Sequence, residues 1–289
     1  MLAREAVSKR VLGYASWHRK RKALHRDEVL HALIRDVAAC APDHVCVTGD
    51  LTNLGLAAEG PTAAAWLDRL GDAGAVSAVP GNHDAYAPDA PPAEVQWPAW
   101  MTGDDGAAGF PYLRRRGGLA IVGVSSAVAT APFLATGRVG EAQAARLETL
   151  LAMAARERLA RVVLVHHPPQ AGAITRRAAL SDAPRLRAVL ARAGAELVLH
   201  GHAHRPMRAT LAGPAGGIPV VGVAAASCIG DARHTPAGFH SIDLDIASGH
   251  VSGVLTHHTY DPARQGFAAV ATEEVAAPGP HTHWPDTAR

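Results

Sequence analysis

Four short clusters of polar residues hold the side chains that could do chemistry. They are Gly49-Asp50-Leu51-Thr52-Asn53, Gly81-Asn82-His83-Asp84, His166-His167-Pro168-Pro169 and Gly201-His202-Ala203-His204. Carboxylate, amide and imidazole groups together suit a divalent metal ion of intermediate softness, such as Mn, Fe, Zn, Co or Ni. Two such ions about 3.5–4 Å apart can clamp a phosphoryl group. The clusters therefore predict a metal centre, provided that the fold brings them together.

Each cluster follows a short apolar run that is typical of a buried strand. Such runs predict strands over residues 44–47, 76–79, 119–125, 161–165 and 196–199. Apolar residues at helical spacing predict helices over residues 24–40, 59–70, 141–159 and 184–193. Ligands of open α/β sheets lie beyond the carboxyl ends of the strands. We therefore expect the four clusters to meet at one edge of the fold.

The last part of the chain has a different pattern. Strands are expected over residues 218–226, 239–246 and 250–260, with Ala247-Ser248-Gly249 as a hairpin turn. From Asp261 the periodicity is weak, so we expect one domain over residues 1–260 and a C-terminal tail over residues 261–289 that is partly mobile. The stretch 85–118 is rich in Pro, Gly and Trp and is expected to be irregular. Alternating strands and helices followed by antiparallel strands predict packed sheets with helices outside.

Composition excludes several classes of protein. A hydrophobic content of 48% excludes a mainly disordered chain, and a net charge of +2 excludes a protein that coats polyanions by bulk charge. The longest apolar stretch, residues 218–229, is shorter than the about 20 residues of a membrane span. We expect no secretion signal at the amino end. Three cysteines match no zinc pattern, so we expect a reducing, cytoplasmic location.

The order of the motifs, GD-x-x-N, GNHD, HHPP and GH-x-H, resembles the calcineurin-like metallophosphoesterase family. The resemblance runs from Asp43 to His204, and the flanking pattern is compatible to about Tyr260. It implies a four-layer αββα sandwich of two mixed β-sheets flanked by helices. It also implies a phosphodiesterase or phosphomonoesterase that acts on a phosphoester substrate with a metal-activated hydroxide at a dinuclear site.

The resemblance also implies a role for each metal-binding residue. Asp50 matches the carboxylate that bridges the two metals. Asn82, His166 and His202 match ligands of the second metal, and His204 matches a ligand of the first.

Four further residues are candidates around the metals. His83 matches the histidine that contacts the phosphate and protonates the leaving oxygen, and Asp84 would orient or polarise it. His167 lines the pocket, contacts substrate or supports its loop. Asn53 lies near the site or supports a local turn.

One part of the family pattern is absent, because the chain has no Asp-x-His. We favour a chain that lacks its first strand, since true loss of a central strand leaves unpaired backbone in a sheet. The alternative is a degenerate member that binds one metal and has a binding or regulatory role with little turnover. His18, His25 and His31 could replace the missing ligands, but surface or packing roles are expected. The basic run 18–22 is expected to be a solvated helix face, so nucleic-acid binding is not expected.

Overall fold

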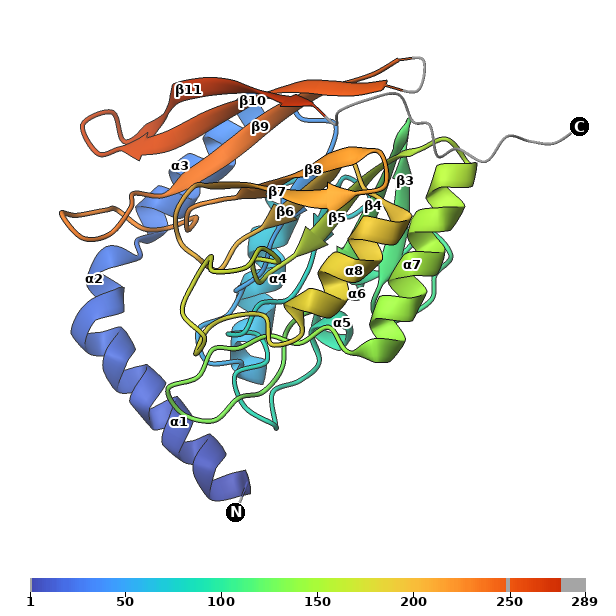
Figure 1. Cartoon of the computed structure of the whole chain (residues 1–289). Helices are drawn as coiled ribbons and strands as arrows, with labels where there is room; N and C mark the ends of the chain where they lie inside the picture. Colours follow the sequence, from blue (N-terminus) through green and yellow to red (C-terminus); the bar gives the residue numbers. More distant parts are fainter. Residues whose placement is uncertain (1, 248–249, 277–289) are drawn as a thin grey trace, which may run out of the picture.

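A mixed six-stranded sheet forms the centre of the molecule (Figure 1). The computed structural model describes residues 2–247 and 250–276. The strand order is β3-β4-β5-β6-β8-β7, in which the four central strands are parallel and the two edge strands antiparallel. The strands are β3 (Tyr112–Arg116), β4 (Leu119–Val124), β5 (Ala160–Val165), β6 (Leu197–His200), β7 (Met207–Gly213) and β8 (Gly216–Gly222).

The central strands are mostly apolar because both faces of the sheet are covered. On one face lie α7 (Glu141–Arg156) and α8 (Ala183–Ala193), whose buried leucines pack on Val163, Val198 and Val220. The long helices begin and end close to the predicted positions, because glycine precedes α7 and follows α8.

The other face carries two smaller sheets. One is the parallel pair β1 (Val45–Val47) and β2 (Val76–Ala78). The other is antiparallel, with the order β11-β10-β9, and comprises β9 (Gly238–Ala247), β10 (His250–Asp261) and β11 (Gly266–Ala276). Residues of both sheets share one apolar core with Ile121, Val162 and Leu197. The second sheet layer is thus present, but in two pieces.

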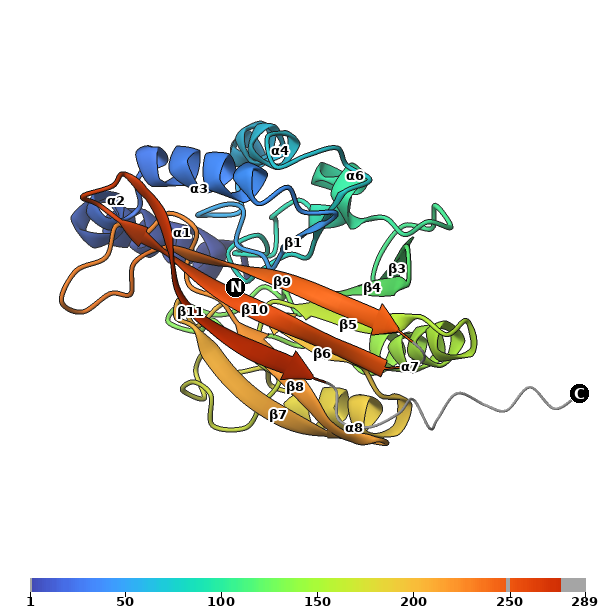
Figure 2. The same cartoon turned by 90° about the horizontal axis from the view of Figure 1, so that it is seen from above.

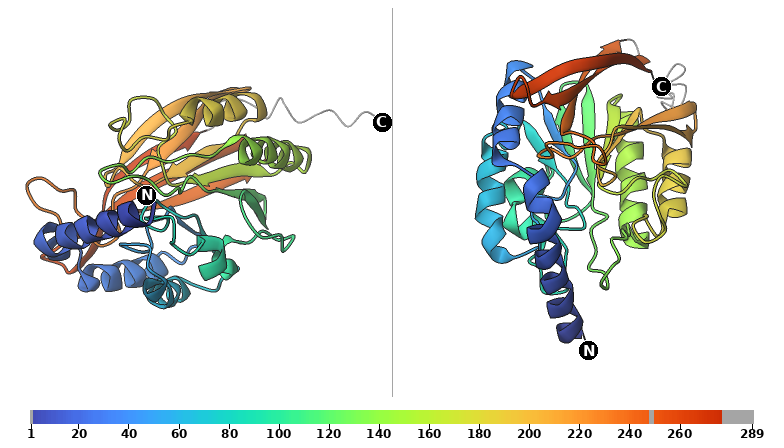
Figure 3. Two further views of the ribbon diagram at one scale, coloured as in Figure 1. Left: turned by 90° about the horizontal axis from the view of Figure 1, so that it is seen from below. Right: turned by 90° about the vertical axis from the view of Figure 1, so that its left-hand side faces the viewer.

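Helices complete the outer layer beside β1 and β2 (Figures 2 and 3). They are α3 (Asp27–Ala39), α4 (Gly60–Asp68), α5 (Ala93–Gln96) and α6 (Pro98–Met101), and a short 3₁₀ turn at Ala57–Glu59 precedes α4. The N-terminal segment is helical in three parts: α1 (Leu2–Ser16), a π-helical stretch (Trp17–Arg21) and α2 (Lys22–Leu24). The layers agree with the predicted αββα sandwich.

The structure adds three strands to those predicted. Residues 112–116 form β3 inside the stretch expected to be irregular, because Arg114 is buried and donates to the carbonyls of Thr102, Ala73, Val76 and Ala99. The third added strand in this sheet, β7, is mostly not buried and pairs with β8 at the edge of the sheet.

The C-terminal region also differs from the prediction. Residues 266–276, expected to belong to a weakly ordered tail, form β11 and pair with β10 from Gly266 to Ala276. The hairpin-turn residues 248–249 and residues 277–289 lie outside the described residues. The domain boundary at residue 260 stays a prediction. No helix among the described residues is long and apolar enough to cross a membrane.

Candidate metal centre

The four polar clusters meet at one edge of the fold, as expected from their position after the strands. Asp50 follows β1, Asn82 follows β2, His166 follows β5 and His202 follows β6. Because β1 and β2 are parallel, and β5 and β6 are parallel, their carboxyl ends point the same way. The structure therefore brings together four of the five predicted metal ligands.

The ligand atoms converge on one point. His166 Nε2 lies 3.2 Å from Asn82 Oδ1, 3.1 Å from His202 Nδ1 and 3.4 Å from Asp50 Oδ2. The possible ligand atoms of Asp50, His166 and His202 all lie within 4.8 Å of one another. Two nitrogens, a carboxylate oxygen and an amide oxygen form a donor set suited to the predicted metals.

The hydrogen bonds of the two histidines fix which nitrogens face the centre. His166 Nδ1–H donates to the Thr48 carbonyl at 2.6 Å, and His202 Nε2–H donates to the Ala178 carbonyl at 2.9 Å. A carbonyl oxygen only accepts, so in the neutral rings the opposite nitrogens are lone pairs. These lone pairs face each other at 3.1 Å. A cation between them removes this conflict, and backbone carbonyls are the usual outer partners of metal-binding histidines.

The electrostatics of the site also favour a positive charge. Burial alone would raise the pKa of Asp50, but the neighbouring His166 and His83 hold that pKa well below its usual value. Burial alone would lower the pKa of His166, but the Asp50 carboxylate raises it above its usual value. An ionised carboxylate beside a ring that attracts a proton also favours a metal cation between them.

Three candidate ligands have unusual backbone conformations. Asp50, His202 and His204 have φ values of 62°, 65° and 53°. Non-glycine residues in this left-handed region carry strain that the surrounding structure must hold in place. Position 49, at φ 104°, accepts only glycine, because a Cβ there would lie 2.7 Å from His166 Nδ1. The tight turn after β1 thus needs glycine for the approach of His166.

That Asp84 orients or polarises His83 stays a prediction, because the described hydrogen bonds of the Asp84 carboxylate go to groups other than the His83 ring. The buried carboxylate of Asp84 accepts backbone N–H groups of Asp50, Leu51, Thr52 and Gly81 at 2.8–3.2 Å. Burial, together with the charge of Asp50, raises the pKa of Asp84 to about 6. Asp84 therefore holds the loop that carries Asp50 in place through hydrogen bonds to the loop's backbone N–H groups.

His83 is held by other groups. Its Nδ1–H donates to the Asn53 carbonyl at 2.6 Å, and its Nε2 lies 3.1 Å from Nη1 of Arg21. Tyr86 stacks on the ring, with the ring centroids 5.3 Å apart. Burial lowers the pKa of His83, Asp50 opposes this, and Arg21 lowers the pKa further. The ring is therefore a neutral group whose Nε2 faces the site.

The two residues with open roles differ in position. His167 is fully buried and contacts Ser126 Oγ at 2.7 Å and the Ala135 carbonyl at 3.1 Å, so it supports its loop. Asn53 takes part through its backbone, because its carbonyl holds His83 and its N–H donates to Glu59 Oε1 at 2.9 Å.

His204 stands apart from the close group of ligands. Its side chain is exposed, and its ring lies 6.4 Å from the ring of His25. His25 is half-buried and contacts Ser227 Oγ at 2.7 Å through Nδ1. His25, one of the three N-terminal histidines for which a surface or packing role was expected, thus lies beside the site.

Sequence reasoning missed Arg21 as a site residue, because the basic run 18–22 is typical of a solvated helix face. The π-helical turn from Trp17 to Arg21 instead aims Arg21 at His83. Such turns occur often at functional sites. Arg21, His83, His25 and His204 line the same cavity as Asp50.

Comparison with known proteins found a family match and a similar solved structure. A family model described as calcineurin-like phosphoesterase matches residues 15–206. A dimetal phosphatase from Danio rerio has a similar structure, with 14% sequence identity, a TM-score of 0.56, and coverage of 86% of this chain and 88% of that chain. At this identity the likeness shows the fold alone. No curated protein matches the sequence. Because the family model covers well over half of its residues, the chain belongs to the calcineurin-like phosphoesterase family.

Proposed function

We propose that the protein is a metal-dependent phosphoester hydrolase whose centre lies where Asp50, Asn82, His166 and His202 meet. The observation that carries this proposal is the pair of imidazole nitrogens that face each other at 3.1 Å, each fixed by a backbone carbonyl on the other side of its ring. Family membership and the fold of a dimetal phosphatase support the proposal.

The four residues fit one divalent ion, and the proposal extends to a second. When bound, such ions supply Lewis-acid chemistry towards phosphoryl oxygens and activate water. Asp50, Asn82, His166 and His202 would hold one ion. Asp50 and His204 would contribute to the other, since both line the same cavity.

His83 and Arg21 are placed to act on an anionic substrate. The Nδ1–H of His83 is occupied by the Asn53 carbonyl, so proton transfer can occur only at Nε2. Arg21 Nη1 donates to that atom at 3.1 Å. A phosphate group that draws Arg21 to its own oxygens frees Nε2, and its negative charge raises the pKa of His83. Substrate binding would therefore favour protonation of His83 at Nε2, and His83 would give this proton to the leaving oxygen.

The second candidate is a metal-binding or regulatory protein with little turnover. It is favoured by the exposed His204, which lies outside the close group formed by Asp50, His166 and His202 among the described residues. Turnover separates the two candidates, because both predict metal binding.

The test is hydrolysis of bis(p-nitrophenyl) phosphate and p-nitrophenyl phosphate by the purified chain with Mn²⁺. We expect hydrolysis of at least one ester, which also shows whether the activity is that of a diesterase or a monoesterase. Chelation should remove it, and His83→Asn should reduce it while the fold is retained. His18→Asn, at an exposed position, is the matched control. Metal binding without hydrolysis of either ester would favour the second candidate.

We also propose a cytoplasmic location. All three cysteines, Cys40, Cys46 and Cys228, are free in the structure, which suits a reducing compartment.

A further inference from the structure

Large apolar side chains that are exposed gather on one region of the surface. Among the described residues, five of the eight such side chains belong to α1 or to loops that contact it. They are Val11, Leu12 and Tyr14 of α1, Leu56 before α4 and Phe133 after β4, and they are 37–79% exposed. Single apolar residues on a surface are ordinary, whereas a group of them marks a site of interaction.

α1 packs one side on the protein and exposes the other. Its inner side lies against the loop before α4, because Arg10 donates to the Gly55 carbonyl at 3.2 Å. Val11 and Tyr14 are three residues apart in the helix and therefore share the outer side. The ring of His18 continues this side, since it lies 4.4 Å from the ring of Tyr14 between centroids. The outer side of the helix thus runs from apolar to basic residues.

The loop after β4 places Phe133 beside this helix. Lys9 of α1 donates to Thr130 Oγ1 at 2.7 Å, and the Thr130 hydroxyl donates to the Leu134 carbonyl at 2.7 Å. α1 and this loop project from the same end of the molecule (Figures 1 and 3). Phe133 is 79% exposed and has a φ of 65°, a conformation that strains a bulky residue. A strained and exposed aromatic ring points to a contact outside the folded chain.

Exposed cations flank the apolar residues on both sides. Arg19 and Lys22 follow α1 in the chain, and both are exposed. Arg176 and Arg177 are exposed on a second loop, whose backbone accepts a hydrogen bond of 2.8 Å from the loop after β4. Asp89, an acidic residue beside α1, forms an ion pair with the helix at 2.6 Å. The surface therefore carries positive charge around an apolar centre.

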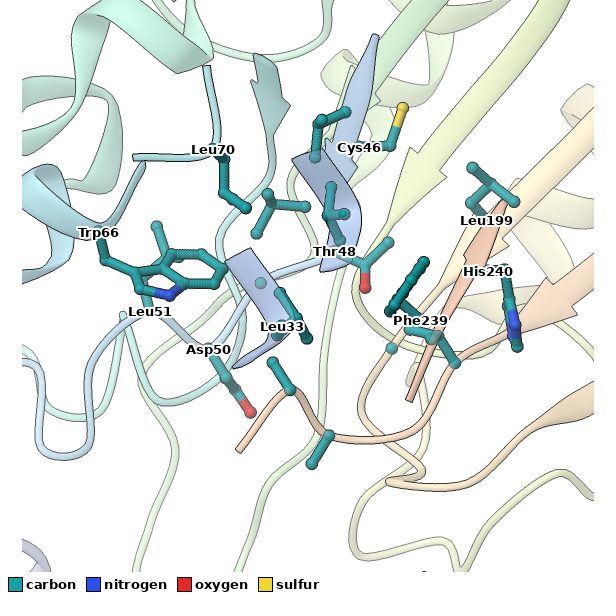
Figure 4. A pocket seen from close by; sticks show the side chains of 18 of the residues that line it. Leu33, Cys46, Thr48, Asp50, Leu51, Trp66, Leu70, Leu199, Phe239 and His240 are labelled. Atoms are coloured by element: carbon teal, nitrogen blue, oxygen red, sulfur yellow. The ribbon is translucent and has the colours of Figure 1, made fainter. Parts of the chain in front are cut away.

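The segment after α1 connects this surface to the metal centre. Trp17 and Arg21 line the same cavity as Asp50, which Figure 4 shows from close by. Arg21 also contacts Nε2 of His83 at 3.1 Å. A partner bound to the outer side of α1 is thus held close to the site.

We propose that this surface docks on an anionic lipid bilayer. Phe133 and the apolar residues of α1 enter the boundary between head groups and acyl chains, and the flanking cations bind the head groups. Apolar side chains that project from a helix and a loop suit a soft bilayer, since protein partners are usually held by anchors in packed pockets. The positive charge on both flanks matches the negative charge of such a bilayer.

The test is sedimentation of the full chain with vesicles of one part phosphatidylglycerol and two parts phosphatidylcholine. We expect binding about tenfold tighter than to phosphatidylcholine alone, because each cation near an anionic surface contributes about 1 kcal/mol. Phe133→Asn should weaken binding by about tenfold, since it removes the inserted ring. Its Tm should not fall, because asparagine tolerates the left-handed backbone of this position. Replacing Arg176 and Arg177 by serine should weaken binding to the anionic vesicles alone.

Two controls accompany the test. Val270→Ser should bind like the wild type, because Val270 is 62% exposed on β11, at the opposite end of the molecule from α1 (Figure 1). His202→Asn should also bind like the wild type, since docking needs no metal. This second control separates a failure of docking from a failure of the proposed function.

Several outcomes would overturn the proposal. They are equal binding of the wild type to both kinds of vesicle, unchanged binding by Phe133→Asn, or an equal loss in Val270→Ser. A dimer of the full chain that Tyr14→Ser dissociates would also overturn it, because a second copy would then cover the surface.

Discussion

At His83, Arg21 contacts Nε2 of the ring and adds to the lowering of its pKa by burial. Because the Arg21 guanidinium lowers the pKa of His83, Arg21→Ala should raise that pKa. If His83 donates its proton in the reaction, the alkaline limb of the kcat/KM profile should move to higher pH. The lost bond to the phosphate should lower kcat/KM by about 10- to 100-fold, since hydrogen bonds of charged groups contribute about 1.5–3 kcal/mol. The measurement is the pH profile of ester hydrolysis.

Arg19→Ala is the matched control for this prediction. Arg19 lies in the same π-helical turn but is exposed. An unchanged alkaline limb in Arg21→Ala, or an equal change in Arg19→Ala, would show that Arg21 does not act on His83.

A buried ion pair offers a second test, of stability. Nη2 of Arg161 lies 2.7 Å from Oε1 of Glu196, and the two side chains are 6% and 5% exposed. Removing one partner leaves an uncompensated buried charge, so Glu196→Ala should lower the free energy of unfolding by about 3–5 kcal/mol. Urea denaturation measures this loss.

The control for the ion pair is Glu148→Ala. Glu148 pairs with Arg192 on the surface, where side chains are 39% and 58% exposed, and such pairs contribute about 0–1 kcal/mol. Similar losses of unfolding free energy for the two variants would mean that burial does not increase the cost of breaking the Arg161–Glu196 pair.

The meeting of the candidate metal ligands could be predicted from sequence, whereas several contacts around them could not. Asp50, Asn82, His166 and His202 follow strands that share an edge, so their meeting follows from the order of strands and motifs. The role of Asp84 depends on which backbone N–H groups come within reach after folding. Arg21 is placed by a π-helical turn that no spacing of apolar residues indicates.

At the scale of elements, α1 is held against the site loops by two charged side chains. Arg10 donates to the carbonyls of Leu54 and Gly55, and Lys9 donates to Thr130 Oγ1 at 2.7 Å. The Lys9 ammonium lies 4.5 Å from the centroid of the Tyr86 ring. The helix is therefore coupled to the loop that carries His83.

Burial of Lys9 predicts a pH dependence of stability. Burial lowers the pKa of Lys9 from 10.5 to about 8. Below pH 8 both states carry the proton, and the folded state bears the cost of a buried charge. Between pH 8 and 10.5 the folded state loses the proton first, so this cost disappears as the pH rises. Stability of the wild type relative to Lys9→Met should therefore increase over this range.

Thermal unfolding of the two proteins at pH 7, 9 and 10.5 measures this change. A difference in Tm that stays constant with pH would contradict the assigned burial of the ammonium group. Lys22→Met, at an exposed position, should show no such dependence.

The helices and strands differ in how clearly their apolar residues mark them in the sequence. The central strands could be predicted because they are short, nearly continuous apolar runs, and α7 and α8 because their apolar residues repeat at the helical period. β3 could not, because Arg114 is an interior residue whose partners are backbone carbonyls from distant segments. β11 could not, because its sequence does not alternate regularly: the apolar Val270 is exposed, whereas the charged Glu273 is half-buried.

At the scale of the whole molecule, the six-stranded sheet and its two helices form one continuous core. The layer opposite is divided between β1–β2 and β9–β11. The ligands come from both sides of this arrangement, since Asp50 and Asn82 follow the small parallel pair, and His166 and His202 follow the large sheet. A bound metal therefore links the two layers and should stabilise them against each other.

The most direct test of the account is the metal content of the purified chain. Elemental analysis after loading with Mn²⁺ and removal of excess ion should give at least one ion per chain. Asp50→Asn and His202→Asn should lose it while they remain folded, since asparagine tolerates the left-handed backbone of both positions. A wild type without metal, or variants that retain it, would contradict the assignment of this centre.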